Sequence, residues 1–372
     1  MAILFYGISI LINVFASKNL RNNMERKTNN FIFFLSFIII FLLMSGYRNT
    51  SGLSNDLSNN ELEYLNIING LNSNYEIGYV LLMKVGGGFT QDFYIFRNVV
   101  IGVFLFFLFW AIRKWAPSPH YVIALFSSYL IILSSEQLRY FLAFVIFVIG
   151  LFILVYSNSK HKKIVFSCFI ILATTIHLSF VIYFIFLISD FSVKSKKEKI
   201  IVTVTLIFCF IIFLNNNQIP GLSQLIKSVD NYKLVVYTSQ STNYGFLYPF
   251  VLQLSSILLT LWALKLYRKS NDNEVNPILE HVYKLNLLAV LFFPLFMLQL
   301  TFYRLARNML IVNYLVFSQI RISKNISYKN RKIFAFVVWN SVILWIVVDL
   351  IIKTPVKALF IPFFTENIYF NF

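Results

Sequence analysis

Charged residues are scarce in this sequence. Only 13% of its 372 residues are Asp, Glu, Lys or Arg, whereas soluble domains carry about 25%. Apolar residues make up 58%, against about 45–50% in soluble domains, so the chain lacks the polar side chains that would cover a surface in water. This composition excludes a soluble globular protein and predicts an integral membrane protein.

Cysteine is nearly absent. Cys168 and Cys209 both lie inside apolar runs, and neither belongs to a CxxC pair or has a histidine at ligand spacing. The sequence therefore predicts no disulfide and no zinc site. It also contains no constellation of metal-ligating residues, so we expect chemistry that uses no metal and no cofactor.

Two further features are missing. The first apolar segment, 2–16, has no basic residues before it and no obvious cleavage site after it, so we expect a retained span and not a signal peptide. The formal net charge is +17, but the basic residues are distributed between apolar runs and form no contiguous stripe. This distribution argues against nucleic acid as a partner.

Long apolar runs are what the sequence does contain. Runs of about 15–20 residues match the helix that crosses about 30 Å of hydrocarbon. Examples are residues 31–44, 93–112, 140–156 and 333–352. Lipid offers the backbone no hydrogen bonds, so these runs must be helices. The predicted class is an all-α polytopic membrane protein.

Most basic residues lie in six linkers between the apolar runs. Because Lys and Arg collect in short cytoplasmic loops, we place all six inside. They are residues 18–27, 113–114, 160–163, 194–199, 265–284 and 321–332. The resulting topology is one transmembrane domain, 1–372, with about twelve helical passes and both termini outside. Its long outer segments, 47–92 and 215–246, exceed about 15 residues, a length usually associated with function.

Two segments do not fit one crossing per apolar run. Residues 76–89 are short, contain Lys84 and end in three glycines, which predicts an interfacial or re-entrant helix. Residues 164–188 form one apolar run between two basic linkers, so this run must enter and leave on the same side. A hairpin with arms of about 12 residues, or about 18 Å, would turn at 174–177 below the outer surface.

Five arginines lie in or beside the apolar runs, near the outer half of the membrane in this topology: Arg48, Arg97, Arg139, Arg304 and Arg307. An ionisable side chain at a helix centre costs about 2.5–3.5 kcal/mol, so its presence indicates function. A guanidinium binds phosphate or carboxylate through two parallel hydrogen bonds, which predicts an outward-facing, anion-binding cavity. The alternative is that each arginine reaches lipid head groups or pairs with a carboxylate. The candidate partners are Glu76, Asp92 and Glu136.

Three residues are candidate general bases. Asp56 and Glu76 lie in the first outer segment, and His177 lies at the predicted hairpin turn. A base that deprotonates a hydroxyl nucleophile must be a carboxylate or a histidine near the substrate. The alternative is that the carboxylates are solvated loop residues and that His177 is a hydrogen-bonded structural residue.

The order of several short motifs resembles the EpsG-like, Wzy-type polymerases of bacterial surface polysaccharides. The motifs are Gly46-Tyr47-Arg48 followed by Gly52 and Asp56, Glu76-Ile77-Gly78-Tyr79, Glu136-Gln137-Leu138-Arg139, His177-Leu178-Ser179 and Arg304-Leu305. The resemblance covers residues 31–320. One motif departs from the family pattern, because the usual Gly-Thr-Asp-Tyr is replaced by Gly52-Leu53-Ser54-Asn55-Asp56. This departure leaves the role of Asp56 open.

The resemblance implies a GT-C-like glycosyltransferase of the bacterial inner (plasma) membrane that extends O antigen, capsule or exopolysaccharide on the outer face. The donor would be the growing glycan on undecaprenyl diphosphate, and a lipid-linked repeat unit would supply the acceptor hydroxyl. Membrane lipids and a chain-length regulator would be further partners. The implied diphosphate ligands are Arg139, Arg304, Arg48, Arg307 and Arg97, and the implied bases are Asp56, Glu76 and His177.

Other functions remain open. A lipid-linked oligosaccharide flippase is the main alternative, although the sequence shows no internal repeat and its arginines gather on one side of the membrane. A membrane acyltransferase, or an O-antigen ligase with the same donor pocket and another acceptor, is the second.

Overall fold

The structure is a computed structural model that describes residues 1–17, 23–50, 52, 55–191, 196–218, 244–270, 276–353 and 356–370. These residues contain helices and no β-strand, apart from one isolated bridge between Tyr47 and Asn367. The predicted all-helical class is therefore confirmed. Most of the second outer segment, 215–246, lies outside the described residues.

The chain divides into two compact units. Unit 1 comprises Met1–Phe184, Phe317–Lys324 and Arg331–Phe372, and unit 2 comprises Ile185–Val316 and Asn325–Asn330. The helices up to the boundary are α1 Ala2–Ala16, α2 Asn23–Gly46, α3 Asn55–Ile68, α4 Ile77–Gly87, α5 Phe93–Trp115, α6 Pro119–Glu136, α7 Leu138–Tyr156, α8 Lys162–Ile176 and the 3₁₀ segment η1 Leu178–Ile188. The later ones are α9 Lys196–Leu214, α12 Leu247–Ser270, α13 Pro277–Leu288, η2 Ala289–Phe292, α14 Phe293–Leu298, η3 Leu300–Phe302, α15 Tyr303–Arg307, α16 Leu310–Ile322, α17 Tyr328–Trp345, the π-helical η4 Ile346–Lys353 and α18 Phe360–Thr365.

Within the described residues, 6 helical segments are long and apolar enough to cross a membrane. They are Lys27–Gly46, Phe93–Trp115, Leu138–Tyr156, Leu247–Ser270, Pro277–Leu298 and Tyr328–Ile352. Each of the runs 31–44, 93–112, 140–156 and 333–352 lies in one of them. The chain is a multi-pass membrane protein, whereas the count of twelve passes and the single transmembrane domain remain predictions.

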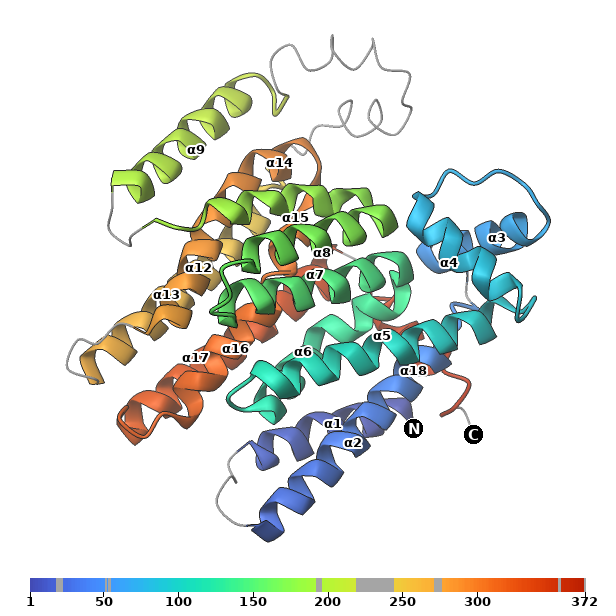
Figure 1. Cartoon of the computed structure of the whole chain (residues 1–372), viewed down its shortest axis with the longest axis horizontal. Coiled ribbons are helices and arrows are strands. Elements are labelled where there is room, and N and C mark those ends of the chain that lie inside the picture. Colours follow the sequence, from blue (N-terminus) through green and yellow to red (C-terminus); the bar gives the residue numbers. More distant parts are fainter. Residues whose placement is uncertain are drawn as a thin grey trace. The chain divides into compact units, whose positions relative to one another are not determined.

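One end of unit 1 brings together the ends of four helices. Arg97, in the first turns of α5, donates hydrogen bonds to the carbonyl oxygens of Met44, Ser45 and Tyr47, at the end of α2. It also donates to the carbonyl oxygen of Ser135, at the end of α6, over 2.8 Å. Since α7 begins at Leu138, two residues after the last residue of α6, its first turn lies at the same place (Figure 1). We call this the site end.

The basic linkers of unit 1 share the opposite end. The ring of Trp115, at the end of α5, lies 5.6 Å from that of Phe152, near the end of α7. The backbone N–H of Ser118 donates to Ser318 Oγ, which joins the start of α6 to the end of α16. Residues 113–114 lie in the last turn of α5, 160–163 lie at the start of α8, and 321–324 include and follow the end of α16. Within unit 1, the arrangement thus agrees with the sidedness predicted from charge.

The chain reverses direction at His177, as the hairpin prediction requires. The ring of Tyr140 on α7 contacts those of His177 and Phe180, and Phe147, two turns later, contacts Phe180 and Tyr183. The segment η1 therefore runs away from the site end beside α7 and in the same direction as α7. Because α8 packs antiparallel to α7, its last turn and the start of η1 meet at the site end (Figure 1).

The first outer segment folds into two short helices at the site end, where α3 and α4 lie beside each other (Figure 1). Helix α4 has 11 residues and is about 16 Å long, too short to cross about 30 Å of hydrocarbon. This length agrees with the interfacial or re-entrant helix predicted there. Helix α3 was not predicted; the ring of its Tyr64 stacks on Phe96 of α5 at 4.7 Å.

The C-terminal segment after α18 covers the end of α2. Asn367 Nδ2 donates to the carbonyl oxygen of Leu43 over 2.9 Å, and the N–H of Ile368 donates to that of Gly46 over 3.0 Å. The Asn367 side chain packs where Gly46 has no Cβ, and any other residue there would overlap with it. The last carbonyl groups of a helix have no hydrogen-bond partner inside the helix. Here Asn367 and Ile368 supply the donors.

Candidate functional site

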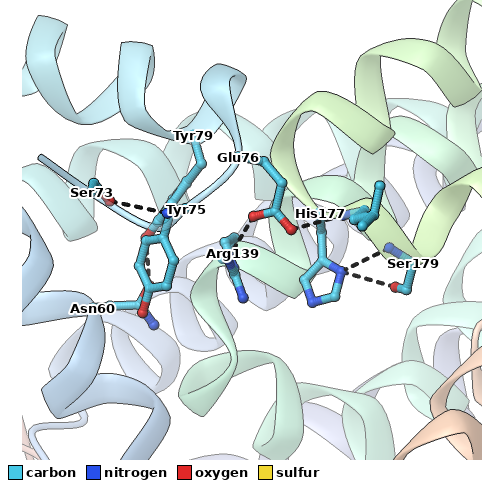
Figure 2. A network of polar contacts seen from close by, with 9 residues as sticks. Asn60, Ser73, Tyr75, Glu76, Tyr79, Arg139, His177 and Ser179 are labelled. Carbon is cyan, nitrogen blue, oxygen red and sulfur yellow. Dashed lines mark hydrogen bonds and ion pairs between the residues drawn. The ribbon is translucent and has the colours of Figure 1, made fainter. Parts of the chain in front are cut away.

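Three segments that are far apart in the sequence meet at the site end of unit 1. Glu76 immediately precedes α4, Arg139 lies in the first turn of α7, and His177 is the residue at which α8 ends. Figure 2 shows the Glu76 carboxylate between the guanidinium of Arg139 and the turn that carries His177. We call these three residues and Tyr75 the Glu76 cluster.

Arg139 is held on two sides. Its Nη1 lies 2.6 Å from Oε2 of Glu76, and the two side chains are 20% and 23% exposed. The face of the guanidinium lies on the ring of Tyr75, with 4.1 Å between Cζ and the ring centroid. The alternative weighed from the sequence, pairing of Arg139 with Glu76, is therefore present. These contacts leave part of the Arg139 side chain accessible.

Tyr75 belongs to the cluster, although no sequence pattern predicts it. Burial raises the pKa of its phenol, and the nearby Arg139 lowers it by a smaller amount. The residue is therefore a neutral aromatic surface against the cation. Its only distinguishing sequence feature is its position directly before Glu76.

Glu76 connects α4 to the His177 turn as well. Its Oε1 accepts a hydrogen bond from the backbone N–H of Leu178 over 3.0 Å, at the first residue of η1. A carboxylate is stabilised at the N-terminal end of a helix, where N–H groups have no partner inside the helix. Both carboxylate oxygens of Glu76 are thus hydrogen-bonded.

Gly78 allows α4 to approach α8 closely. A Cβ atom at this position would lie 2.8 Å from the carbonyl oxygen of Thr175, closer than real Cβ atoms come to backbone oxygens. We expect Gly78→Ala to push α4, and Glu76 with it, away from the His177 turn. A shift of about 1 Å near a catalytic centre costs up to about 100-fold in rate. The initial rate of polymer formation from lipid-linked repeat units should therefore fall by at least about tenfold.

Gly7→Ala is the matched control for that prediction. Nothing lies within 4 Å of a Cβ atom built at Gly7, so the same substitution there should leave the rate unchanged. Equal rates for Gly78→Ala and wild type would show that the close approach of α4 has no catalytic importance.

His177 has an extended backbone, and its ring is oriented by its neighbours. Nδ1 lies 2.9 Å from Oγ of Ser179, and the ring packs edge-on against Tyr140 with 5.1 Å between centroids. The side chain is partly exposed. A histidine and a serine in one tight turn, beside an arginine, can bind an anion or transfer a proton.

Asp56 lies near the cluster, in the first turn of α3. The N–H of Leu57 donates to Oε1 of Glu136 over 3.0 Å, so Glu136 stabilises the start of this helix. Asp56 also interacts electrostatically with Tyr75. The structure thus brings all three candidate bases to the site end.

Arg48 and Arg97 also lie at the site end but make different contacts. Arg97 is completely buried, and its donors bind the backbone carbonyl groups that end α2 and α6. This placement favours a structural role over the predicted contact with diphosphate. Arg48 is partly exposed, donates from Nη1 to the carbonyl oxygen of Ser45 over 2.8 Å, and lies over the ring of Tyr94.

Arg304 and Arg307 belong to unit 2, where they lie in the short helix α15. Arg307 is 3% exposed and donates from Nη1 to the Tyr303 hydroxyl over 3.3 Å, while Arg304 is partly exposed. The ring of Tyr303 packs against that of Tyr248 in α12.

The buried carboxylate of Asp349 is a further candidate that the sequence-based hypothesis did not include. Asp349 lies in η4, within the last span, and Oδ2 accepts a hydrogen bond from the Tyr129 hydroxyl of α6 over 2.6 Å. Its signal in the sequence is a carboxylate inside the apolar run 333–352. Ionisable residues and π-helical turns inside membrane helices both accompany function, so Asp349 joins the candidates.

Comparison with protein families matches residues 31–365 to the EpsG family. Comparisons with curated proteins and with solved structures find no match. The matched region contains nearly the whole chain, including every residue of the Glu76 cluster. This multi-pass membrane protein therefore belongs to the EpsG family, which associates it with polysaccharide biosynthesis.

Proposed function

We propose that the protein is a polysaccharide polymerase that joins oligosaccharide repeat units carried on undecaprenyl diphosphate, at the outer face of the bacterial inner membrane. The observation that supports this most is the meeting of Arg139, Glu76 and His177 at one end of unit 1, in a chain of the EpsG family. A lipid-borne diphosphate requires a cationic site next to the membrane. Arg139, at the site end, would supply this cation.

The proposed reaction is a glycosyl transfer. The acceptor hydroxyl oxygen attacks the anomeric carbon of the donor glycan, and the bond from that carbon to the diphosphate oxygen breaks. The undecaprenyl diphosphate leaves with increased negative charge, which fixed cations stabilise in the transition state. Arg139 is the principal ligand in this proposal, together with Arg48 of unit 1, while Arg304 and Arg307 of unit 2 remain candidates on the sequence alone.

The hydroxyl proton goes to a base. Asp56, Glu76 and His177 are the candidates, and the hydrogen bonds at both oxygens of Glu76 favour the other two. A chain-length regulator and the surrounding lipids are the proposed partners. About twelve helical passes with an outward-facing, GT-C-like cavity are the proposed architecture.

The purified protein should be incubated with lipid-linked repeat units and the products separated by size. A ladder of products, each larger by one repeat unit, is expected. Translocation across a vesicle membrane without a change in size would identify a flippase, and transfer only to a lipid A core would identify a ligase. Either of these results would contradict the proposal.

A further inference from the structure

The guanidinium of Arg139 is fixed before any substrate arrives. Glu76 binds one of its edges through Nη1, and Tyr75 covers one of its faces at 4.1 Å. Arginine side chains otherwise lose considerable rotamer entropy when they bind. The two neighbours therefore orient the planar group in advance.

Arg139 keeps donors for a ligand in this orientation. A guanidinium carries five N–H donors, and Glu76 is the only hydrogen-bond acceptor that Arg139 has among the described residues. A phosphate group can accept two parallel hydrogen bonds from one guanidinium edge. The contact with Glu76 thus orients Arg139 without using up its capacity for an anion.

Glu76 also fixes the position of the turn that carries His177. One oxygen of its carboxylate holds Arg139, and the other holds the N–H of Leu178, the residue after His177 (Figure 2). A general base must turn a carboxylate oxygen toward the substrate hydroxyl, and here the guanidinium of Arg139 and the N–H of Leu178 fix the orientation of the carboxylate from both sides. The carboxylate is better suited to set the spacing between the cation and the histidine.

We propose that Glu76 is a positioning residue, which together with Tyr75 orients Arg139 toward the diphosphate of the lipid-linked donor and fixes the His177 turn beside it. The inference rests on the proposed function for the identity of the donor. It assigns Glu76 no role in proton transfer.

Two kinetic signatures separate positioning from base catalysis. Glu76→Gln keeps an amide oxygen that can accept from Leu178 but loses the negative charge that holds Arg139. We expect KM for the lipid-linked donor to rise about tenfold, with the acid limb of the pH–rate profile unchanged. A base role predicts instead a fall in kcat of about 100-fold or more and the loss of that limb.

Tyr75 provides a second and independent variant. Tyr75→Phe keeps the aromatic face and should behave as wild type, whereas Tyr75→Ala removes it and should raise KM for the donor. Glu280→Gln is the control for the loss of an ion pair. Glu280 pairs with Lys284 over 2.9 Å at similar exposure, in unit 2, and this variant should leave KM unchanged.

Binding of undecaprenyl diphosphate to the full-length protein in detergent tests the inference without turnover. Glu76→Gln and Tyr75→Ala should each weaken this binding about tenfold, and Glu280→Gln should not change it. If wild type forms no ladder, the proposed function fails, and the binding measurement still tests the positioning. Unchanged binding in both variants, or a kcat effect with loss of the acid limb in Glu76→Gln, would overturn the inference.

Discussion

Arg97→Met is expected to yield little folded protein. Its guanidinium is completely buried and binds the carbonyl oxygens that end α2 and α6, and Glu136, which is 3% exposed, interacts with it electrostatically. Methionine keeps much of the volume but leaves these groups without their donor. Removing one partner of a buried charged pair costs about 3–5 kcal/mol, a large part of the total stability of most domains.

Thermal unfolding in detergent, followed by size-exclusion chromatography, measures this effect. Arg113→Met is the matched control, because Arg113 lies in the same helix, is exposed, and within the described part of the chain donates to Asn30 alone, at the basic end. The control should unfold near the wild-type temperature. Arg97→Met should lose its monodisperse peak or unfold at a much lower temperature. A wild-type profile for Arg97→Met would show that the carbonyl groups find other donors.

Arg139→Ala is expected to abolish chain extension while the protein still inserts and folds. Removing one preorganised donor from an anionic transition state costs about 10²–10³-fold in kcat. The ion pair with Glu76 contributes little to stability, because partly exposed pairs contribute about 0–1 kcal/mol. Glu76 retains its hydrogen bond to Leu178 in this variant.

The measurement is the product ladder from lipid-linked repeat units, at equal amounts of detergent-purified protein. Arg268→Ala serves as the control, since Arg268 is also an arginine paired with a glutamate at similar exposure but lies in unit 2, within the basic linker 265–284. It should produce full-length ladders. Wild-type polymer lengths from Arg139→Ala would remove this residue from the site.

The spans were predictable because a lipid environment requires long apolar helices, and the runs 31–44 and 93–112 have no other stable structure in hydrocarbon. The two segments that do not fit one crossing per apolar run were predictable from the same length requirement. Segments 76–89 and 164–188 could not cross once, and the structure brings both to the site end. The sequence therefore indicated where the candidate site lies.

The roles of individual arginines were not predictable. Arg97 and Arg139 look alike in sequence, since each lies near the start of an apolar run. Only the fold shows that Arg97 meets helix ends that carry unpaired carbonyl groups, while Arg139 meets a carboxylate and an aromatic ring. Such contacts depend on long-range packing, as does the pairing of Asp349 with Tyr129.

The C-terminal segment imposes an order on biogenesis. Residues 42–46 are synthesised early, but Asn367, which binds the carbonyl oxygen of Leu43, lies 324 positions further along the chain, and Ile368, which binds that of Gly46, follows it. The site end is therefore incomplete in a nascent chain until these two residues have been synthesised. Termination before Asn367 would leave the end of α2 uncovered.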